Sequence, residues 1–298
     1  AVIALMMTIS ASAQFYIYCS DGNVIKVDSI SMIAPEENVD PYNGHEYVDL
    51  GLNVKWATCN VGATKPEEYG DYFTWGETQP KSNYDWSTYK YCNGSYNTLT
   101  KYNNSSSYGT VDNKTTLDLS DDAARANWGG AWRMPTDAEL TELLEQCTWT
   151  WTIQNGVNGR KVTSKTNGNS IFLRAAGYRY YTSLIYADNV LYEGYYWSSS
   201  LYTSTDYPTN AYGLNFSTGH VVLEMSGRCY GLAVRPVLGE TTIPTVTTTI
   251  PTQITETTAV AGGNVTADGN ASVTERGVVY GKSPNPTISN LNNTIRPC

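Results

Sequence analysis

Charged residues are scarce in this chain, and basic ones are the scarcest. Asp, Glu, Lys and Arg together make up 16% of the 298 residues, and 28 acidic against 19 basic residues give a formal net charge of -9. Proteins bind nucleic acid by neutralising its phosphates with clustered Lys and Arg. A chain with this charge balance is therefore not expected to have nucleic acid as a partner.

Residues that bind metals or carry out catalysis are also few. His45 and His220 are the only imidazoles, and no two of the six cysteines form a C-x-x-C pair. A zinc site is improbable, and there is no EF-hand spacing, nucleophile elbow, Walker loop or dinucleotide fingerprint. Loops rich in Asp and Asn contain oxygen ligands of the kind that bind calcium, so the sequence excludes a calcium site less firmly than a zinc site. We predict no metal, no cofactor and no catalytic residue.

The cysteines are spaced too widely for a disulfide scaffold. They lie at positions 19, 59, 92, 147, 229 and 298. Isolated thiols of this kind are usually buried and behave as small apolar side chains. Most are therefore predicted to be buried single thiols, although an oxidising compartment would permit disulfides.

The longest apolar run lies at the start of the chain. Residues 1–9 carry no charge, and the small residues Ser10-Ala11-Ser12-Ala13 fit the rule for signal-peptidase cleavage before Gln14. We interpret residues 1–13 as a partial signal peptide and expect a secreted or cell-surface protein; a buried N-terminal strand is the alternative. The run is too short to cross a bilayer, and no other segment has transmembrane length.

Tyr, Trp, Thr, Ser, Asn and Gly are abundant, which suits β-strands and long polar loops better than helices. Residues 69–112 have little periodicity and are predicted to form surface loops. One strong helix is predicted over residues 135–145, with Thr136 as N-cap and Glu139 at the capping-box position, and a weaker helix over residues 121–127. The predicted fold class is a loop-rich α+β fold with one main helix.

Changes in composition divide the rest of the chain into four segments. Residues 14–40 are predicted to form an N-terminal hairpin and linker, and residues 41–238 the main domain. Residues 239–258 are rich in Thr and Pro and are predicted to be a linker, because prolines interrupt strand pairing. Residues 259–298 are predicted to be the first strands of a truncated β-sandwich.

Five blocks of the main domain carry a resemblance to a known family. They are Val48–Ala63, Gly70–Thr78, Asn127–Thr136, Tyr196–Ser200 and Arg228–Val237. In order and spacing they resemble the Fibrobacter succinogenes major paralogous domain family, which is similar to the formylglycine-generating-enzyme-like branch of the C-type lectin fold. The resemblance therefore implies a C-type-lectin-like domain. The segment after it looks like the immunoglobulin or fibronectin-like repeats of Bacteroidetes surface proteins.

The motif residues have structural explanations. Arg133 and Arg235 are predicted to make structural ion pairs or carbonyl contacts. Trp197, followed by three serines, predicts a packed strand whose hydroxyls satisfy neighbouring backbone groups. The resemblance implies a relationship to formylglycine-generating enzymes, which use two closely spaced cysteines near the end of the domain. This region of the chain has only Cys229. We therefore predict that the protein is not an enzyme.

Loops rich in Tyr, Ser, Asn and Gly favour a binding function, because these residues combine rigid amphipathic contacts with adaptable hydrogen bonding. The resemblance extends to retroelement-diversified variable proteins and implies that residues 195–237 form the contact surface. The predicted protein is an exported adhesin or receptor that binds a protein or glycan on another cell or host surface. A structural cell-surface or pilus-like subunit is the alternative, and a divergent formylglycine-generating-type enzyme is less favoured.

Period-2 alternation over residues 210–225 predicts a hairpin with two unlike faces. The predicted core face consists of Tyr212, Leu214, Phe216, Val221, Leu223 and Met225. The other face, which includes Ala211 and Gly213, should contact the ligand together with the preceding loop, and Tyr202, Tyr207 and His220 should give most of the buried area. The predicted ligand-binding residues are Tyr202, Ser204, Thr205, Asp206, Tyr207, Asn210, Asn215, His220, Val222 and Glu224.

Overall fold

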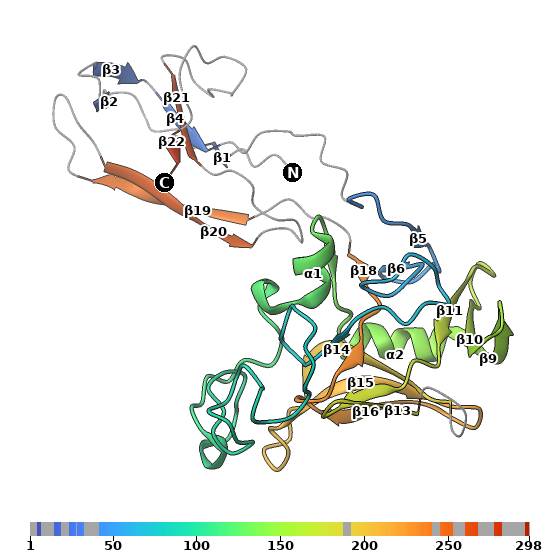
Figure 1. The fold of residues 1–298 in the computed structure, drawn as a ribbon. Helices are drawn as coiled ribbons and strands as arrows, with labels where there is room; N and C mark the ends of the chain where they lie inside the picture. Colours follow the sequence, from blue (N-terminus) through green and yellow to red (C-terminus); the bar gives the residue numbers. More distant parts are fainter. Residues whose placement is uncertain are drawn as a thin grey trace. The chain divides into compact units, whose positions relative to one another are not determined.

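The computed structural model describes residues 42–186 and 192–239, and outside these ranges the strands at 5–6, 15–18, 24–27, 29–32, 245–252, 260–267, 277–281 and 296–297. The chain forms two compact units, one of residues 41–239 and the other of residues 1–40 together with 240–298. The described residues are mostly β, with few helices and several small sheets (Figure 1), which agrees with a loop-rich α+β fold class. Every helix in the described part of the chain is too short or too polar to span a membrane.

The smaller unit is built from paired strands. They are β1 (Leu5–Met6), β2 (Phe15–Tyr18), β3 (Val24–Val27), β4 (Ser29–Met32), β19 (Thr245–Thr252), β20 (Val260–Ala267), β21 (Gly277–Gly281) and β22 (Arg296–Pro297). β2 pairs antiparallel with β3, while β4 pairs with both β1 and β21. β1 lies in the segment interpreted as a signal peptide, and cleavage of that segment stays a prediction.

The predicted linker at residues 239–258 needs a correction, because it contains strand β19, which pairs antiparallel with β20. The segment is rich in Thr, Val and Ile, and these β-branched residues favour strands. Pro251 falls where the register of the pair shifts between Thr249 and Thr252. An irregular position of this kind accommodates a residue that has no N–H for the ladder.

The larger unit holds four sheets among its described residues, in the strand orders β16-β15-β14-β17-β7, β5-β6-β18-β8, β11-β10-β9 and β12-β13. The first strands are β5 (Tyr47–Val48), β6 (Lys55–Ala57), β7 (Tyr72–Phe73), β8 (Trp132–Arg133), β9 (Cys147–Gln154), β10 (Val157–Ser164) and β11 (Ser170–Arg174). The remaining strands are β12 (Tyr178–Tyr180), β13 (Ser183–Ile185), β14 (Gly194–Leu201), β15 (Asn210–Phe216), β16 (Val221–Gly227), β17 (Leu232–Ala233) and β18 (Val237–Leu238). The helices are η1 (Ser106–Tyr108), η2 (Leu119–Asp121), α1 (Ala123–Trp128) and α2 (Asp137–Gln146).

Helix α2 covers one face of the five-stranded sheet, as Figure 1 shows. Its predicted capping box is confirmed: the Thr136 hydroxyl accepts from the Glu139 backbone N–H at 3.2 Å, and the Glu139 carboxylate accepts from the Thr136 backbone N–H at 2.8 Å. Leu140 and Leu143 are buried in one cluster with Leu214 of β15. The weaker predicted helix is present as α1.

The motif residues are structural, as predicted. The Arg133 guanidinium forms a two-pronged ion pair with the Glu139 carboxylate, at 2.8 and 2.5 Å. The buried Arg235 guanidinium donates to the carbonyls of Ala57 and Thr58, at 3.1 and 2.9 Å. These bonds hold β6 and the residue after it against the C-terminal segment of the larger unit, which contains Arg235.

The strand motif at Trp197 also packs as predicted. The Trp197 indole is fully buried and donates to the Phe73 carbonyl at 2.7 Å. The hydroxyl of Ser198 donates to the Tyr212 carbonyl at 2.8 Å, and that of Ser200 donates to the Asp137 carboxylate at 2.8 Å. The small hydroxyls therefore satisfy groups on β15 and at the start of α2.

Arg228 is fully buried directly after β16 and bonds to loops that lie far apart in the sequence. Its Nε donates to the Tyr89 hydroxyl at 2.9 Å, and its Nη2 to the Lys101 carbonyl at 3.0 Å. Its Nη1 donates to the carbonyls of Tyr102 and Pro208, at 2.9 and 3.1 Å. Buried polar groups that lose their partners are costly, so this side chain holds the long loops on the sheet.

We expect Arg228→Met to lower the free energy of unfolding by about 3 kcal/mol or more, because four buried acceptors lose their donor. Urea titration followed by tryptophan fluorescence measures the change. Lys161→Met, at an exposed position of β10, is the matched control and should change the free energy by less than about 0.5 kcal/mol. Equal stability of the two variants would contradict this role of Arg228.

Candidate functional site

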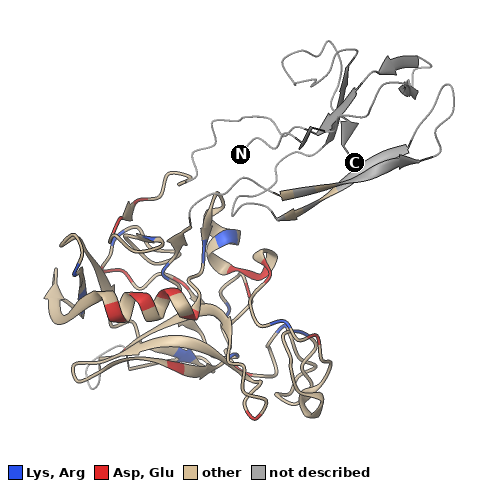
Figure 2. Cartoon of the chain, turned by 180° about the vertical axis from the view of Figure 1, so that it is seen from behind, with Lys and Arg blue, Asp and Glu red and all other residues tan. Residues whose placement is uncertain are grey.

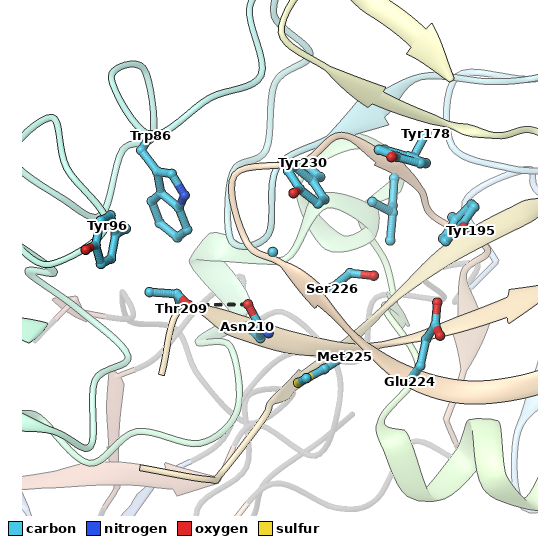
Figure 3. A pocket seen from close by; sticks show the side chains of 12 residues that line it. Trp86, Tyr96, Tyr178, Tyr195, Thr209, Asn210, Glu224, Met225, Ser226 and Tyr230 are labelled. Carbon is cyan, nitrogen blue, oxygen red and sulfur yellow. Dashed lines mark hydrogen bonds between the residues drawn. The ribbon is translucent and has the colours of Figure 1, made fainter. Parts of the chain in front are cut away.

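An open groove of about 420 Å³ lies against the five-stranded sheet, on the face away from α2 (Figure 3). Aromatic side chains and small polar groups form its walls. Its lining residues are Trp86, Tyr96, Tyr178, Tyr195, Thr209, Asn210, Glu224, Met225, Ser226, Gly227, Tyr230 and Leu232. Concave surfaces with aromatic walls and a few polar groups are the usual form of a ligand site.

The strand register explains which side chains reach the groove. Gly213 of β15 lies opposite Glu224 of β16 and Trp197 of β14. Side chains directly opposite one another share a face, so Glu224 lies on the groove side of the sheet. Gly213 has no side chain, and a Cβ there would lie 3.5 Å from Leu232 and 3.7 Å from Trp197, so these two side chains pack close to the strand beside Glu224.

Tyrosines form a continuous array along the upper wall of the groove. The Tyr178 ring contacts those of Tyr195 and Tyr230, with centroids 4.9 and 5.5 Å apart. Tyr180 extends the array, because its ring lies 5.0 Å from Tyr230 and 4.4 Å from Tyr181. The array therefore runs from β14 across the β12–β13 hairpin to the rim.

The rim of the groove is unusually exposed for aromatic residues. Tyr181 and Tyr96 expose 51% and 52% of their surfaces, and Tyr180 and Tyr186 are also exposed. Ring contacts hold several of these side chains in place, so little rotamer freedom is left to lose on binding. Such a rim is suited to contact with a partner.

The acidic groups of the groove lie on its β14 and β16 side. Burial raises the pKa of Glu224, which Figure 3 shows pointing toward Tyr195. The Tyr195 hydroxyl donates to the Glu193 carboxylate at 2.5 Å. Burial and this neighbouring carboxylate raise the pKa of Tyr195, so the phenol is neutral at physiological pH.

Two of the predicted ligand-binding residues, Asn210 and Glu224, line the groove. Asn215 was predicted to be exposed, and this is wrong: it exposes 3% of its surface, and its amide oxygen lies 2.5 Å from Nε2 of His220. Ala211 and Gly213 on the same face are buried as well. Ala211 is buried in the core cluster that packs on this face, and Leu232 and Trp197 pack against Gly213, whereas His220 and Val222 are exposed.

The predicted contact surface is also not continuous. Tyr202 and Tyr207 lie in the loop that leads into β15 together with Ser204, Thr205 and Asp206, and the Tyr202 ring packs 5.1 Å from that of Tyr212. His220 lies beyond the other end of β15. A strand of this length spans roughly 20 Å, so one compact contact cannot centre on both ends.

The predicted core face of the hairpin is confirmed in part. Leu214 and Phe216 are buried, and Val221 and Leu223 pack against the same core. Met225 was predicted to be buried but is 39% exposed. β16 is the edge strand, so Met225 has a neighbouring strand on one side only.

The contact segment expected from the sequence, residues 195–237, includes nine of the twelve residues that line the groove. Sequence reasoning did not identify Trp86, Tyr96 or Tyr178, which lie outside that segment, and it gave Tyr230 no individual role. The run Tyr178-Arg179-Tyr180-Tyr181 was an available signal, because consecutive aromatics in a polar segment are not explained by a core. The period-2 pattern of residues 210–225 was a stronger signal than this run. The main contact residues were therefore predicted at the two ends of that hairpin.

The four described cysteines are free thiols: Cys59, Cys92, Cys147 and Cys229. Cys229 exposes 1% of its surface, and burial raises its pKa to about 12. Among the described residues, no three His, Cys, Asp or Glu side chains come together as a potential metal site.

No model of a known protein family matches the sequence, and neither a curated protein nor a solved structure matches the chain. We therefore infer the function from the geometry of the groove and its rim.

We expect the Cys229 thiol to resist alkylation in the folded protein. With a pKa of about 12 it is almost entirely protonated at pH 8, and the thiol form is a poor nucleophile. Iodoacetamide treatment at pH 8 followed by peptide mass spectrometry should leave Cys229 unmodified, whereas the same treatment in urea should modify it fully. Rapid modification of Cys229 in the native state would indicate an activated thiol and favour an enzyme.

Proposed function

We propose that the protein is an exported, non-enzymatic ligand-binding protein of adhesin or receptor type, and that the tyrosine-lined groove is its binding site. The observation that carries the proposal is the joined set of aromatic side chains in the groove and on its rim. Aromatic residues supply large contact areas and fix few side-chain torsions on binding, which makes them the commonest anchors of binding sites.

The groove also contains the polar groups that a binding site needs for specificity. Thr209, Asn210 and Ser226 lie along its floor and can donate or accept hydrogen bonds. Glu224 adds one charge, partly shielded from water. Aromatic walls around a few directed polar groups are typical of selective recognition rather than of nonspecific adhesion.

The larger unit is proposed to have a C-type-lectin-like fold, as its sequence motifs imply. One main helix, small sheets and a long loop region are in keeping with that architecture. Residues 195–237, which correspond by resemblance to the variable region of retroelement-diversified proteins, include β14 to β17 and thus one wall of the groove. The proposed site therefore overlaps that segment and extends beyond it to Trp86, Tyr96 and Tyr178.

The non-enzymatic part of the proposal is supported by the chemistry of Cys229. A buried thiol whose pKa is about 12 carries little thiolate at neutral pH, so it lacks the activation that a catalytic cysteine needs. Under this proposal Cys229 fills space in the core next to the groove.

The binding site can be tested by screening the full chain against arrays of glycans and extracellular proteins. For any ligand found, Tyr181→Ala and Tyr96→Ala should each weaken binding by about 1 kcal/mol, roughly fivefold, because both rings offer exposed contact area. Calorimetry measures the affinity. The melting temperature should change little, since both side chains are half exposed.

Ile153→Ala is the matched control, because Ile153 is 67% exposed on β9, outside the groove. It should leave the affinity unchanged. Tyr207→Ala and His220→Ala test the two ends of the hairpin that were predicted from sequence. Retained affinity in the rim variants, with loss in either of these two, would show that the groove is not the site.

A further inference from the structure

The groove contains one charged side chain among its lining residues, the carboxylate of Glu224. The three long strands β14, β15 and β16 contain no other Asp, Glu, Lys or Arg. Figure 2 shows that acidic residues instead follow α2, on the other side of the sheet. Glu224 is therefore the one charged residue in the lining, and the carboxylate of Glu193, bonded to the Tyr195 hydroxyl, lies outside the lining.

The immediate neighbours of Glu224 on the groove side offer it no positive charge. Gly213 lies directly opposite, and Val222 and Ser226 are its neighbours along β16. The next residues across the ladder, Ala211 and Asn215, are neutral and buried. Within the described residues, the Glu224 carboxylate has neither a hydrogen bond nor an ion pair.

Two charged groups act on Glu224 from outside this ring. Burial is the main reason that the pKa of Glu224 is raised; His220 lowers this pKa and the Glu193 carboxylate raises it. A partly desolvated carboxylate without a partner is unfavourable, and a cation that entered the groove would remove that cost.

Aromatic rings surround the space in front of this carboxylate. Tyr178, Tyr195 and Tyr230 line the groove on the side toward which Glu224 points (Figure 3). The faces of aromatic rings attract ammonium and guanidinium groups, and this attraction increases where water is partly excluded. A cation at this position would gain from the rings and from the carboxylate together.

We propose that the groove receives a basic side chain, Lys or Arg, of a partner protein, with Glu224 as its ion-pair partner and Tyr178, Tyr195 and Tyr230 as its aromatic surround. This inference rests on the groove being the binding site. A neutral glycan could donate hydroxyl groups to Glu224 but would leave its charge uncompensated. The charge of the groove therefore favours a basic protein over a neutral glycan.

The proposal is tested with small probes on the full-length chain. Nα-acetyl-lysine methylamide and Nα-acetyl-arginine methylamide present the two cations, and Nα-acetyl-norleucine methylamide presents an apolar chain of similar shape. NMR titration should show at least fivefold tighter binding of a cationic probe than of the norleucine probe. Methyl glycosides of glucose and galactose supply the glycan comparison.

Glu224→Gln removes the charge and keeps the shape, so it should abolish the advantage of the cationic probe over the norleucine probe. Glu145→Gln removes the same charge from the exposed end of α2 and should keep that advantage. Tyr230→Ala should weaken the cationic probe more than the norleucine probe, because the cation loses its attraction to the ring as well as the apolar contact.

Binding of the cationic probe should also depend on pH. A bound cation favours ionised Glu224, so the affinity should fall as the pH drops through the raised pKa of this residue. The surrounding phenols stay neutral there, because burial raises the pKa of Tyr178, Tyr195 and Tyr230. His220→Gln should keep the dependence, whereas Glu224→Gln should lose it.

Equal affinity for the cationic and norleucine probes, an unchanged advantage in Glu224→Gln, or tighter binding of a glycoside would each overturn the proposal. With any of these outcomes, the groove would still be the binding site if the rim variants Tyr181→Ala and Tyr96→Ala lower the affinity for a ligand. Failure of the rim variants would overturn the proposed function itself, so the two failures are distinguishable.

Discussion

The hydrogen bonds of the buried Arg228 guanidinium are the interaction on which the groove depends. Residues 77–118 form few regular elements and therefore have few ladder hydrogen bonds of their own. The bonds from Arg228 to Tyr89, Lys101 and Tyr102 attach this long segment to the end of β16. Trp86 and Tyr96 belong to the same segment, so one wall of the groove is positioned by a side chain that does not touch the groove itself.

The two faces of the five-stranded sheet differ in how far they are covered. Its α2 side is closed by apolar packing around Leu140, Leu143 and Leu214, and capping-box bonds fix the start of that helix. Its other side combines buried small residues on β15 with exposed groups on β16 and the β12–β13 hairpin. Apolar burial therefore acts on both faces: Trp197 and Ala211 belong to a second core cluster on the groove side, and Tyr178, Tyr195 and Tyr230 pack at the edge of that cluster.

Local patterns in the sequence predicted the elements, and long-range contacts decided the site. The capping box of α2, the ion pair of Arg133 and the packing of Trp197 depend on neighbouring residues or on a single motif, and all were predicted. Asn215 and Met225 were misplaced because alternation along a strand does not say which strands lie beside it. Tyr178 and Tyr230 come together only through the pairing of distant segments, which no period in the sequence reports.

The hairpin that carries the exposed tyrosines is joined to the rest of the unit through main-chain bonds. Arg179 and Gly231 exchange two backbone hydrogen bonds, at 2.7 and 2.9 Å, and a methyl group at Gly231 would come within 2.4 Å of the Tyr84 ring. Main-chain hydrogen bonds do not depend on side-chain identity, so substitutions at the tip of this hairpin leave the attachment unaltered, whereas a side chain at Gly231 would clash with Tyr84. The exposed side chains of this hairpin can therefore change without a change in the backbone that carries them.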